Sequence, residues 1–302
     1  MRQFLFKAGI FCAINLFLAL VYLGITQSFS RERTEAHLFT IPRNQRYDAV
    51  FLGASHSRVF SATGNHSRME KILDKKIVNL SKTAAGLMPE EVYLSYFYEQ
   101  GNTTSEVVYF LDPFVLYAAR WNEDAYFLED EPIKFDFLAM ALRQGLFGLR
   151  PSVVGNYLRS KFEIFWLISR RAPPATPDEE ARALTNRDEE AVKKRLAVLY
   201  PEEVKASNFE KYKPALEAVI RLAQTNGTHI TIVFLPTLLG DLPGTYPVKE
   251  LLLELKKQQA IDFFDFSATM KEPRFYSDHD HLNTAGVEYF MRNYLKKIFS
   301  KL

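Results

Sequence analysis

The chain has 302 residues, of which 47% are hydrophobic and 25% are charged. This is the composition of a folded globular protein, and it excludes a disordered, collagenous or coiled-coil chain. Lys and Arg number 38 against 36 Asp and Glu, without the basic excess that is typical of a nucleic-acid-binding protein. The single cysteine, Cys12, excludes an intramolecular disulfide and a cysteine metal cluster.

The N-terminal segment is apolar and carries no charge from residue 8 to residue 25. A run of this length can cross a bilayer as a helix, and Arg2 and Lys7 before it favour an N-terminus on the inside. We expect a single-pass membrane anchor over 1–29 and a periplasmic or extracellular domain over 30–302. A cleaved signal peptide is the alternative, because 28–30 reads Ser-Phe-Ser, although the apolar run exceeds the usual length for one.

The remaining chain alternates between apolar runs and helical patterns. The runs predict buried strands at 47–53, 76–80, 106–111, 228–235 and 261–265. Helical patterns lie around 68–74, 89–100, 212–225 and 247–258, and a last amphipathic helix carries Val287, Met291, Tyr294 and Ile298 on one stripe after a cap at Asn283 or Thr284. Such alternation predicts an α/β fold with a parallel sheet.

Residues 114–210 contain no obvious strand. The stretches 135–149 and 153–168 are rich in Phe, Leu and Trp, and 178–195 is highly charged. A structureless loop of this length is unusual, so we expect a helical insertion. It either packs as a subdomain or presents an apolar face that lines an acyl pocket or contacts the membrane or a membrane partner.

Two polar clusters carry the residues suited to chemistry. The first, at 53–58, directly follows the first predicted strand, where parallel sheets bind ligands. Its Ser55 becomes a nucleophile if a histidine takes its proton and a carboxylate holds that histidine. In the second cluster, Asp278 and His281 are three residues apart and fall on one side of a turn. We therefore expect Asp278 to orient His281 and His281 to reach Ser55, with Asp280 pointing away.

Two other interpretations of these clusters stay open. His279, His281 and Asp278, joined by His56, are ligand types that suit zinc or iron. The second cluster could also be an inert surface loop. The Gly-x-Ser-x-Gly elbow of α/β-hydrolases fits less well, because the fifth position here is Ser57 and that fold places its acid and histidine on separate loops.

These blocks together resemble the SGNH/GDSL hydrolase superfamily. Residues 51–55 look like its nucleophile block, and Asp-x-x-His at 278–281 looks like its last block. Residues 77–80, with Asn79 and the later Gly86, are similar to its second block, whose glycine N–H helps to form the oxyanion hole. The resemblance implies a flavodoxin-like three-layer α/β/α sandwich, a Ser55–His281–Asp278 triad, ester or acyl-transfer chemistry and no cofactor.

The chain departs from that family's pattern at two places. The third block normally supplies an asparagine as an oxyanion donor, whereas residues 111–114 read Leu-Asp-Pro-Phe. The hole would then rest on the backbone N–H groups of Ser55 and Gly86, or on another donor. Because the loss of one donor typically lowers the rate about 10²–10³-fold, we expect a slow or specialised enzyme. Gly86 also lies later after Asn79 than in the usual block, so Ala84 could occupy the equivalent place.

An anchor followed by such a domain also resembles the membrane-anchored SGNH proteins of bacterial envelopes, of the DltD or alginate-acetylation kind. Those proteins work beside membrane-bound O-acyltransferases, which implies such a partner here. Arg58 could hold an anionic substrate group or lie inert on the surface. We expect an esterase or O-acyltransferase that acts on acyl esters of envelope polymers or lipids. The alternatives are a non-catalytic partner on this scaffold and a metal-dependent hydrolase.

Overall fold

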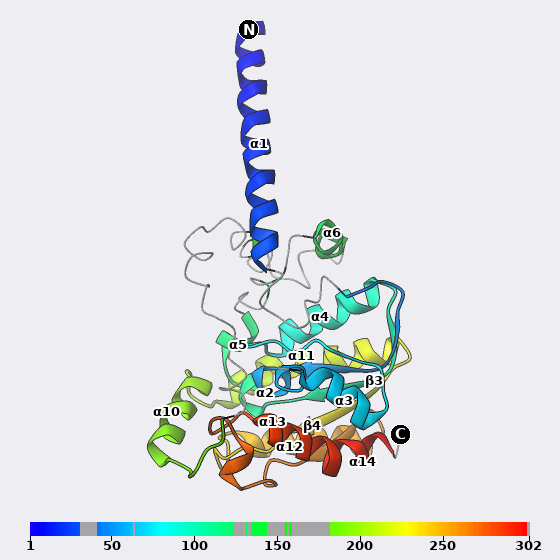
Figure 1. Cartoon of the computed structure of the whole chain (residues 1–302), viewed down its shortest axis with the longest axis vertical. Helices are drawn as coiled ribbons and strands as arrows, with labels where there is room; N and C mark the ends of the chain where they lie inside the picture. Colours follow the sequence, from blue (N-terminus) through cyan, green and yellow to red (C-terminus); the bar gives the residue numbers. More distant parts are fainter. Residues whose placement is uncertain are drawn as a thin grey trace.

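The computed structural model describes residues 1–30, 41–62, 64–123, 128, 131, 134–143, 155, 157–158 and 182–300 (Figure 1). Its centre is a five-stranded sheet in the order β2-β1-β3-β4-β5, and every neighbouring pair is parallel. The strands are β1 (Arg46–Gly53), β2 (Ile77–Asn79), β3 (Thr103–Phe110), β4 (His229–Phe234) and β5 (Asp262–Asp265). This is the flavodoxin-like strand order, and each strand lies within a run predicted from the sequence or extends it by a few residues.

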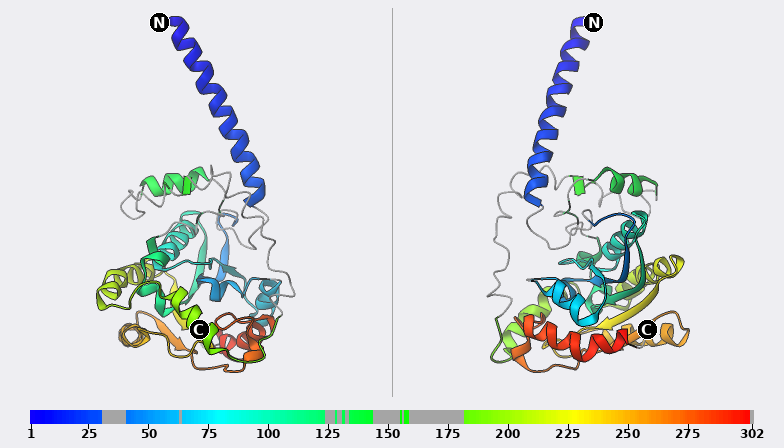
Figure 2. Two further views of the ribbon diagram at one scale, coloured as in Figure 1. Left: turned by 90° about the vertical axis from the view of Figure 1, so that its left-hand side faces the viewer. Right: turned by 45° about the vertical axis from the view of Figure 1, so that its right-hand side comes forward.

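Helices cover both faces of the sheet (Figure 2), because successive strand side chains point to opposite sides. Val50 and Leu52 belong to one core, while Ala49 and Phe51 belong to the other. The first core is covered by α4 (Leu87–Glu99), α11 (Ala206–Thr225) and α12 (Thr245–Lys257). The second is covered by α3 (Asn65–Leu73), α13 (Thr284–Phe290) and α14 (Lys296–Phe299). The predicted three-layer α/β/α architecture is therefore confirmed.

The last helix begins and packs as its sequence indicates. Asn283 caps it, with its side-chain oxygen accepting a hydrogen bond from Gly286 N at 2.9 Å. Val287, Met291 and Ile298 are buried in the second core, with Tyr294 half-buried beside them. The helix is interrupted by a π-helical turn, η5 (Met291–Leu295), which joins α13 to α14. The Asn283 side chain also donates to the Arg274 carbonyl oxygen at 2.8 Å, so it ties the end of the loop 278–283 to the start of the helix and to the preceding chain.

The described parts of the predicted insertion contain helices and no strand, with non-helical stretches at 182–188 and 200–205. The helices are η2 (Pro113–Leu116), α5 (Ala119–Glu123), α6 (Phe135–Arg143) and α10 (Glu189–Leu199). Nearly all of 144–181, which includes the Phe- and Trp-rich stretch at 153–168, lies outside the described residues. Helix α11 begins at Ala206, so the predicted boundary at 210 falls inside its first turn.

The N-terminal segment forms one helix, α1 (Arg2–Ser30). Its portion Arg2–Tyr22 has a mean hydropathy of 2.2 and is long and apolar enough to cross a membrane. Large apolar side chains such as Phe4, Phe11 and Phe17 are exposed along it. Helix α1 therefore has the properties of a membrane anchor or of a signal sequence.

Candidate active site

The site is built on the turn that follows β1. Strand β1 ends at Gly53, whose φ is +143°, a conformation open essentially to glycine alone. A Cβ on Gly53 would lie 2.4 Å from Ser57 Oγ and 2.7 Å from the Phe110 carbonyl oxygen. This close approach to β3 lets the chain turn at once into α2 (Ser55–Arg58). Ser55 is consequently the first residue of a short helix at the carboxyl end of a central strand.

Replacing Gly53 with alanine is expected to lower the free energy of unfolding by about 3 kcal/mol or more, because backbone strain and steric overlap add. Gly227→Ala is the matched control, since Gly227 also has a positive φ (+68°) but its Cβ would meet nothing within 4 Å. That variant should lose only about 1 kcal/mol. Urea unfolding of both variants measures the difference, and equal losses would contradict the close packing at Gly53.

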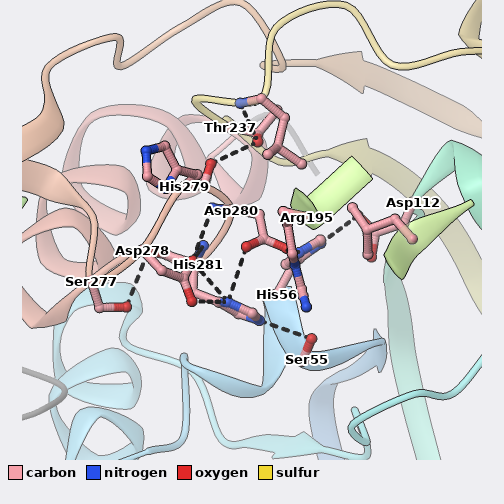
Figure 3. A network of polar contacts seen from close by, with 12 residues as sticks. Ser55, His56, Asp112, Arg195, Thr237, Ser277, Asp278, His279, Asp280 and His281 are labelled. Carbon is pink, nitrogen blue, oxygen red and sulfur yellow. Dashed lines mark hydrogen bonds and ion pairs between the residues drawn. The ribbon is translucent and has the colours of Figure 1, made fainter. Parts of the chain in front are cut away.

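The structure brings together the three residues on which the sequence analysis placed the chemistry (Figure 3). Ser55 Oγ donates to His281 Nε2 at 2.9 Å, and His281 Nδ1 donates to Asp278 Oδ2 at 2.8 Å. Asp278 Oδ1 also accepts from the backbone N–H of His281 at 2.7 Å. The spacing of three residues thus closes a turn in which the carboxylate fixes both the backbone and the ring of His281.

The Asp278 carboxylate differs from its partners in exposure. Its side chain is 53% exposed, whereas that of His281 is 18% exposed. A carboxylate in contact with water can still orient the His281 ring through its hydrogen bond, but water weakens its electrostatic interaction with that ring. The arrangement can move a proton from Ser55 to His281 and hold the ring in the tautomer that accepts it.

Gly86 does not offer the backbone donor expected of it. Its N–H donates to the Trp121 carbonyl oxygen at 2.9 Å, and a Cβ there would lie 2.7 Å from the same oxygen. Gly86 therefore packs the start of α4 against α5. The expectation fails because the spacing after Asn79 places Gly86 beyond the loop that lies beside the nucleophile turn.

Ala84 has a backbone conformation that is uncommon for a residue other than glycine. Its φ is +62°, and within the described part of the chain its N–H donates to no backbone or side-chain acceptor. Two hydrogen bonds tie its loop to the nucleophile turn, one from Lys82 N to Gly53 O at 3.0 Å and one from Arg58 Nη1 to Thr83 Oγ1 at 3.2 Å. Ser55 N–H likewise has no acceptor among the described residues.

Asn79, at the end of β2, links the nucleophile turn to the loop that follows β2. It is 3% exposed, its Nδ2 donates to Ser57 O at 3.1 Å, and its Oδ1 accepts from Ser81 N at 3.0 Å. Ser57 Oγ in turn lies 2.8 Å from Ser81 Oγ. These contacts occupy both ends of the Asn79 amide, so Asn79 holds the nucleophile turn to the following loop and is not placed to bind substrate.

Arg58 is the last residue of α2 and faces the loop that contains Thr83. It is exposed, and its contact with Thr83 is the hydrogen bond given above. Its position next to the nucleophile turn is compatible with an anionic substrate group, and equally with an inert surface residue.

His56 and Asp280 form a second, buried network beside the first. His56 Nδ1 lies 2.7 Å from Asp112 Oδ1, and its Nε2 lies 2.8 Å from Asp280 Oδ2. The expectation that Asp280 points away is therefore wrong: its side chain is 1% exposed, and its Oδ1 lies 3.5 Å from His281 Nδ1. The physical reason is that a buried cation-forming side chain, His56, stands opposite Asp280 and compensates its charge.

Asp112 and Arg195 are site residues that the sequence analysis did not select. Asp112 follows β3, at the place where the resemblance calls for an asparagine. Arg195 comes from α10 in the insertion, and its Nε donates to Asp280 Oδ2 at 2.5 Å. The aspartate at position 112 was noted in the sequence as a departure from the expected asparagine, but not as a partner of His56. Nothing in the sequence distinguished Arg195 from the other charges of 178–195.

The metal interpretation does not fit the hydrogen bonds. Among the described residues, His56, Asp280 and His281 form the group whose ligand atoms lie within 4.8 Å of one another. Both ring nitrogens of His56 already face carboxylates, which makes them donors and removes the lone pair that a metal needs. His279 lies elsewhere, with its Nε2 accepting from Asp188 N at 2.9 Å.

An apolar cavity of about 340 Å³ adjoins the buried network. Three of its lining residues, His56, Asp112 and Asp280, belong to that network. The apolar part of the lining includes Leu111, Phe234, Leu235, Leu239 and Leu242. The cavity lies beyond the carboxyl ends of β3 and β4, where such folds bind ligands.

Known protein structures resemble this chain distantly. No protein-family model matches the chain, and no curated protein matches it. Among solved structures, a Bacteroides fragilis protein assigned as an acylhydrolase is 12% identical, covering 87% of this chain and 92% of its own, with a TM-score of 0.43. A GDSL-like lipase of Bacteroides thetaiotaomicron is 9% identical, covering 85% and 88%, with a TM-score of 0.40. These are distant likenesses.

Proposed function

We propose that this protein is a serine-dependent enzyme that cleaves or transfers acyl esters. The observation that carries the proposal is the continuous chain of hydrogen bonds from Ser55 Oγ through His281 to Asp278, at 2.9 and 2.8 Å. A hydroxyl at the start of a helix, a neutral imidazole that accepts its proton and a carboxylate that fixes the tautomer are the parts of an activated nucleophile.

In this proposal Ser55 Oγ attacks the ester carbonyl carbon while its proton moves to His281 Nε2. The tetrahedral intermediate collapses when His281 returns that proton to the leaving alcohol, and the acyl group stays on Ser55. Water as the second acceptor releases the acid, and a sugar or polyol hydroxyl gives a new ester. His281 takes the proton of either acceptor, and Ser55 regains it when the acyl group departs.

The N–H groups of Ser55 and Ala84 are the donors we assign to the carbonyl oxygen as it becomes negative. Both lack an acceptor within the described residues, and Ala84 holds a left-handed φ of +62° that aims a backbone N–H in an uncommon direction. Two backbone donors fixed before the reaction stabilise the oxyanion without reorganisation. The third-block position cannot help, because Asp112 is a hydrogen-bonded carboxylate.

Two features near the site support the substrate class that we propose. The apolar cavity beside His56 and Asp280 suits an aliphatic acyl chain, and the apolar helix α1 suits attachment to a membrane. We propose a membrane-anchored enzyme outside the cytoplasm that acts on acyl esters of envelope polymers or lipids. A membrane-bound O-acyltransferase is the partner that such a role implies.

Turnover of aryl esters by the full-length protein in detergent tests this proposal. We expect release of the aryl alcohol from a series running from acetyl to octanoyl esters, unaffected by EDTA. Loss of turnover in EDTA, restored by zinc, would favour a metal-dependent hydrolase. No turnover with any ester by folded protein would favour a non-catalytic role for the scaffold.

A further inference from the structure

His56 is held from both sides by carboxylates. It is 7% exposed, its Nδ1 lies 2.7 Å from Asp112 Oδ1, and its Nε2 lies 2.8 Å from Asp280 Oδ2. An imidazole can donate from both nitrogens only when it is protonated on both. The two distances are those expected of an imidazolium whose two N–H groups each donate to a carboxylate.

The balance of forces at His56 favours this charged form. Burial by itself would lower its pKa, but the hydrogen bonds and charges of Asp112 and Asp280 outweigh burial and raise the pKa to about 10. Burial by itself would raise the pKa of Asp280, but His56, His281 and Arg195 together hold that pKa well below its ordinary value. The pair is consequently ionised across the physiological range.

The imidazolium connects three segments that are distant in sequence. His56 lies in α2 next to the nucleophile, Asp112 follows β3, and Asp280 belongs to the loop that carries the base. The rings of His56 and His281 are 4.8 Å apart between centroids. The network thus holds the loop containing His281 against the turn containing Ser55.

Charged groups approach His281 from several elements. Asp278 and Asp280 come from its own loop, His56 from α2, and Arg195 from α10 through Asp280. The Asp280 Oδ1 atom is 3.5 Å from His281 Nδ1, so an uncompensated Asp280 would favour the protonated ring, which cannot act as a base. His56 and Arg195 supply the compensating positive charge.

We propose that His56 is a positively charged positioning residue, which joins Asp112 to Asp280, fixes the base loop beside Ser55 and offsets the Asp280 charge that His281 would otherwise face. The positive charge of His56 and its contacts do not depend on the function proposed above. The effect of His56 on catalysis does rest on that function.

The charge is tested on the unmodified protein. Full-length protein labelled with ¹⁵N-histidine, in detergent at pH 8, should show one ring with both nitrogens protonated, and this signal should be missing in His56→Gln. A signal for His56 with one unprotonated nitrogen at pH 8 would overturn the proposal. The measurement does not depend on enzymatic activity. If His56→Gln does not fold, the His56 ring of the wild-type protein can be assigned from its contacts with neighbouring residues.

The positioning role is tested by kinetics with three variants. His56→Gln should lower kcat about 10²-fold with little change in KM, as expected when a reacting group is misplaced, and the acid limb of its pH–rate profile should move to higher pH. Asp280→Asn should move that limb to lower pH. The double variant should recover at least about tenfold over His56→Gln, because the buried charge is removed with its partner.

His229→Gln is the matched control, since His229 pairs with Asp262 at 3.0 Å at an exposed position outside the network. It should retain wild-type kinetics. Two results would show that His56 is a packing residue. One is an unchanged acid limb of the pH–rate profile in both His56→Gln and Asp280→Asn, and the other is a double variant with a kcat no higher than that of His56→Gln. If the wild type has no esterase activity, the proposed function fails while the NMR result still decides the charge.

Discussion

Replacing Ser55 with alanine should lower kcat/KM for an aryl ester by about 10⁴-fold or more, the scale found when a triad nucleophile is removed. The variant loses the oxygen that forms the acyl bond, so no other group on the turn replaces it. Ser55 is half-buried at the start of α2, and its Oγ faces His281. The fold should therefore survive the change, which far-UV circular dichroism and urea unfolding can check.

Ser67→Ala is the matched control for this loss. Ser67 is exposed on α3, and within the described part of the chain its hydroxyl donates to the Gly64 carbonyl oxygen, at 3.2 Å. It should keep wild-type kinetics. A Ser55→Ala variant that retains more than about one tenth of the activity in folded protein would show that another residue performs the attack.

Replacing Asp278 with asparagine should lower kcat about 10³-fold, while KM changes little. The amide has the shape of the carboxylate but no longer favours the His281 tautomer that accepts the Ser55 proton. We expect a smaller loss than the about 10⁴-fold found where the acid is buried, because the Asp278 side chain is 53% exposed and Asp280 lies 3.5 Å from the same nitrogen.

Asp262→Asn is the control for that variant. Asp262 makes a carboxylate–histidine contact of similar length, 3.0 Å to His229 Nε2, at the edge of the sheet. Activity should be unchanged by it. If Asp278→Asn is equally harmless, the orienting carboxylate is Asp280, and the double variant with Asp280→Asn should then show the full loss.

The sheet and the residues at its carboxyl edge were predictable because they obey local rules. Continuous apolar runs such as 47–53 and 228–235 form buried parallel strands, and the first turn after β1 must lie at the edge where ligands bind. The spacing of Asp278 and His281 likewise predicted a turn that the structure contains. These inferences needed only neighbours in sequence.

The buried network was not predictable in the same way. Asp112 follows β3, Asp280 lies in the last loop, and Arg195 belongs to α10. Folding brings Asp112 and Asp280 to His56, and Arg195 to Asp280. The sequence does not indicate which residue of a charged stretch will be buried, or which partner will compensate its charge. For the same reason Asp280 was expected to face solvent, although its side chain is 1% exposed.

The loop between β2 and α4 shows how the position of a glycine in the sequence can mislead. Gly86 was the only glycine in reach of the second block, but its N–H binds the Trp121 carbonyl oxygen. The left-handed backbone falls on Ala84, with a φ of +62°, although an alanine pays strain there that a glycine would not. The glycine therefore indicated the block, and the backbone conformation favours Ala84, the alternative named from the sequence, as the donor that we propose.

The most direct test of Ser55 as the activated nucleophile is the site at which the protein reacts with a fluorophosphonate. Full-length wild-type protein should form one covalent adduct, which peptide mass spectrometry places on Ser55, and His281→Ala should slow its formation about 10²-fold or more. An adduct on a different residue, or none in folded wild-type protein under conditions that label a known serine hydrolase, would contradict the account.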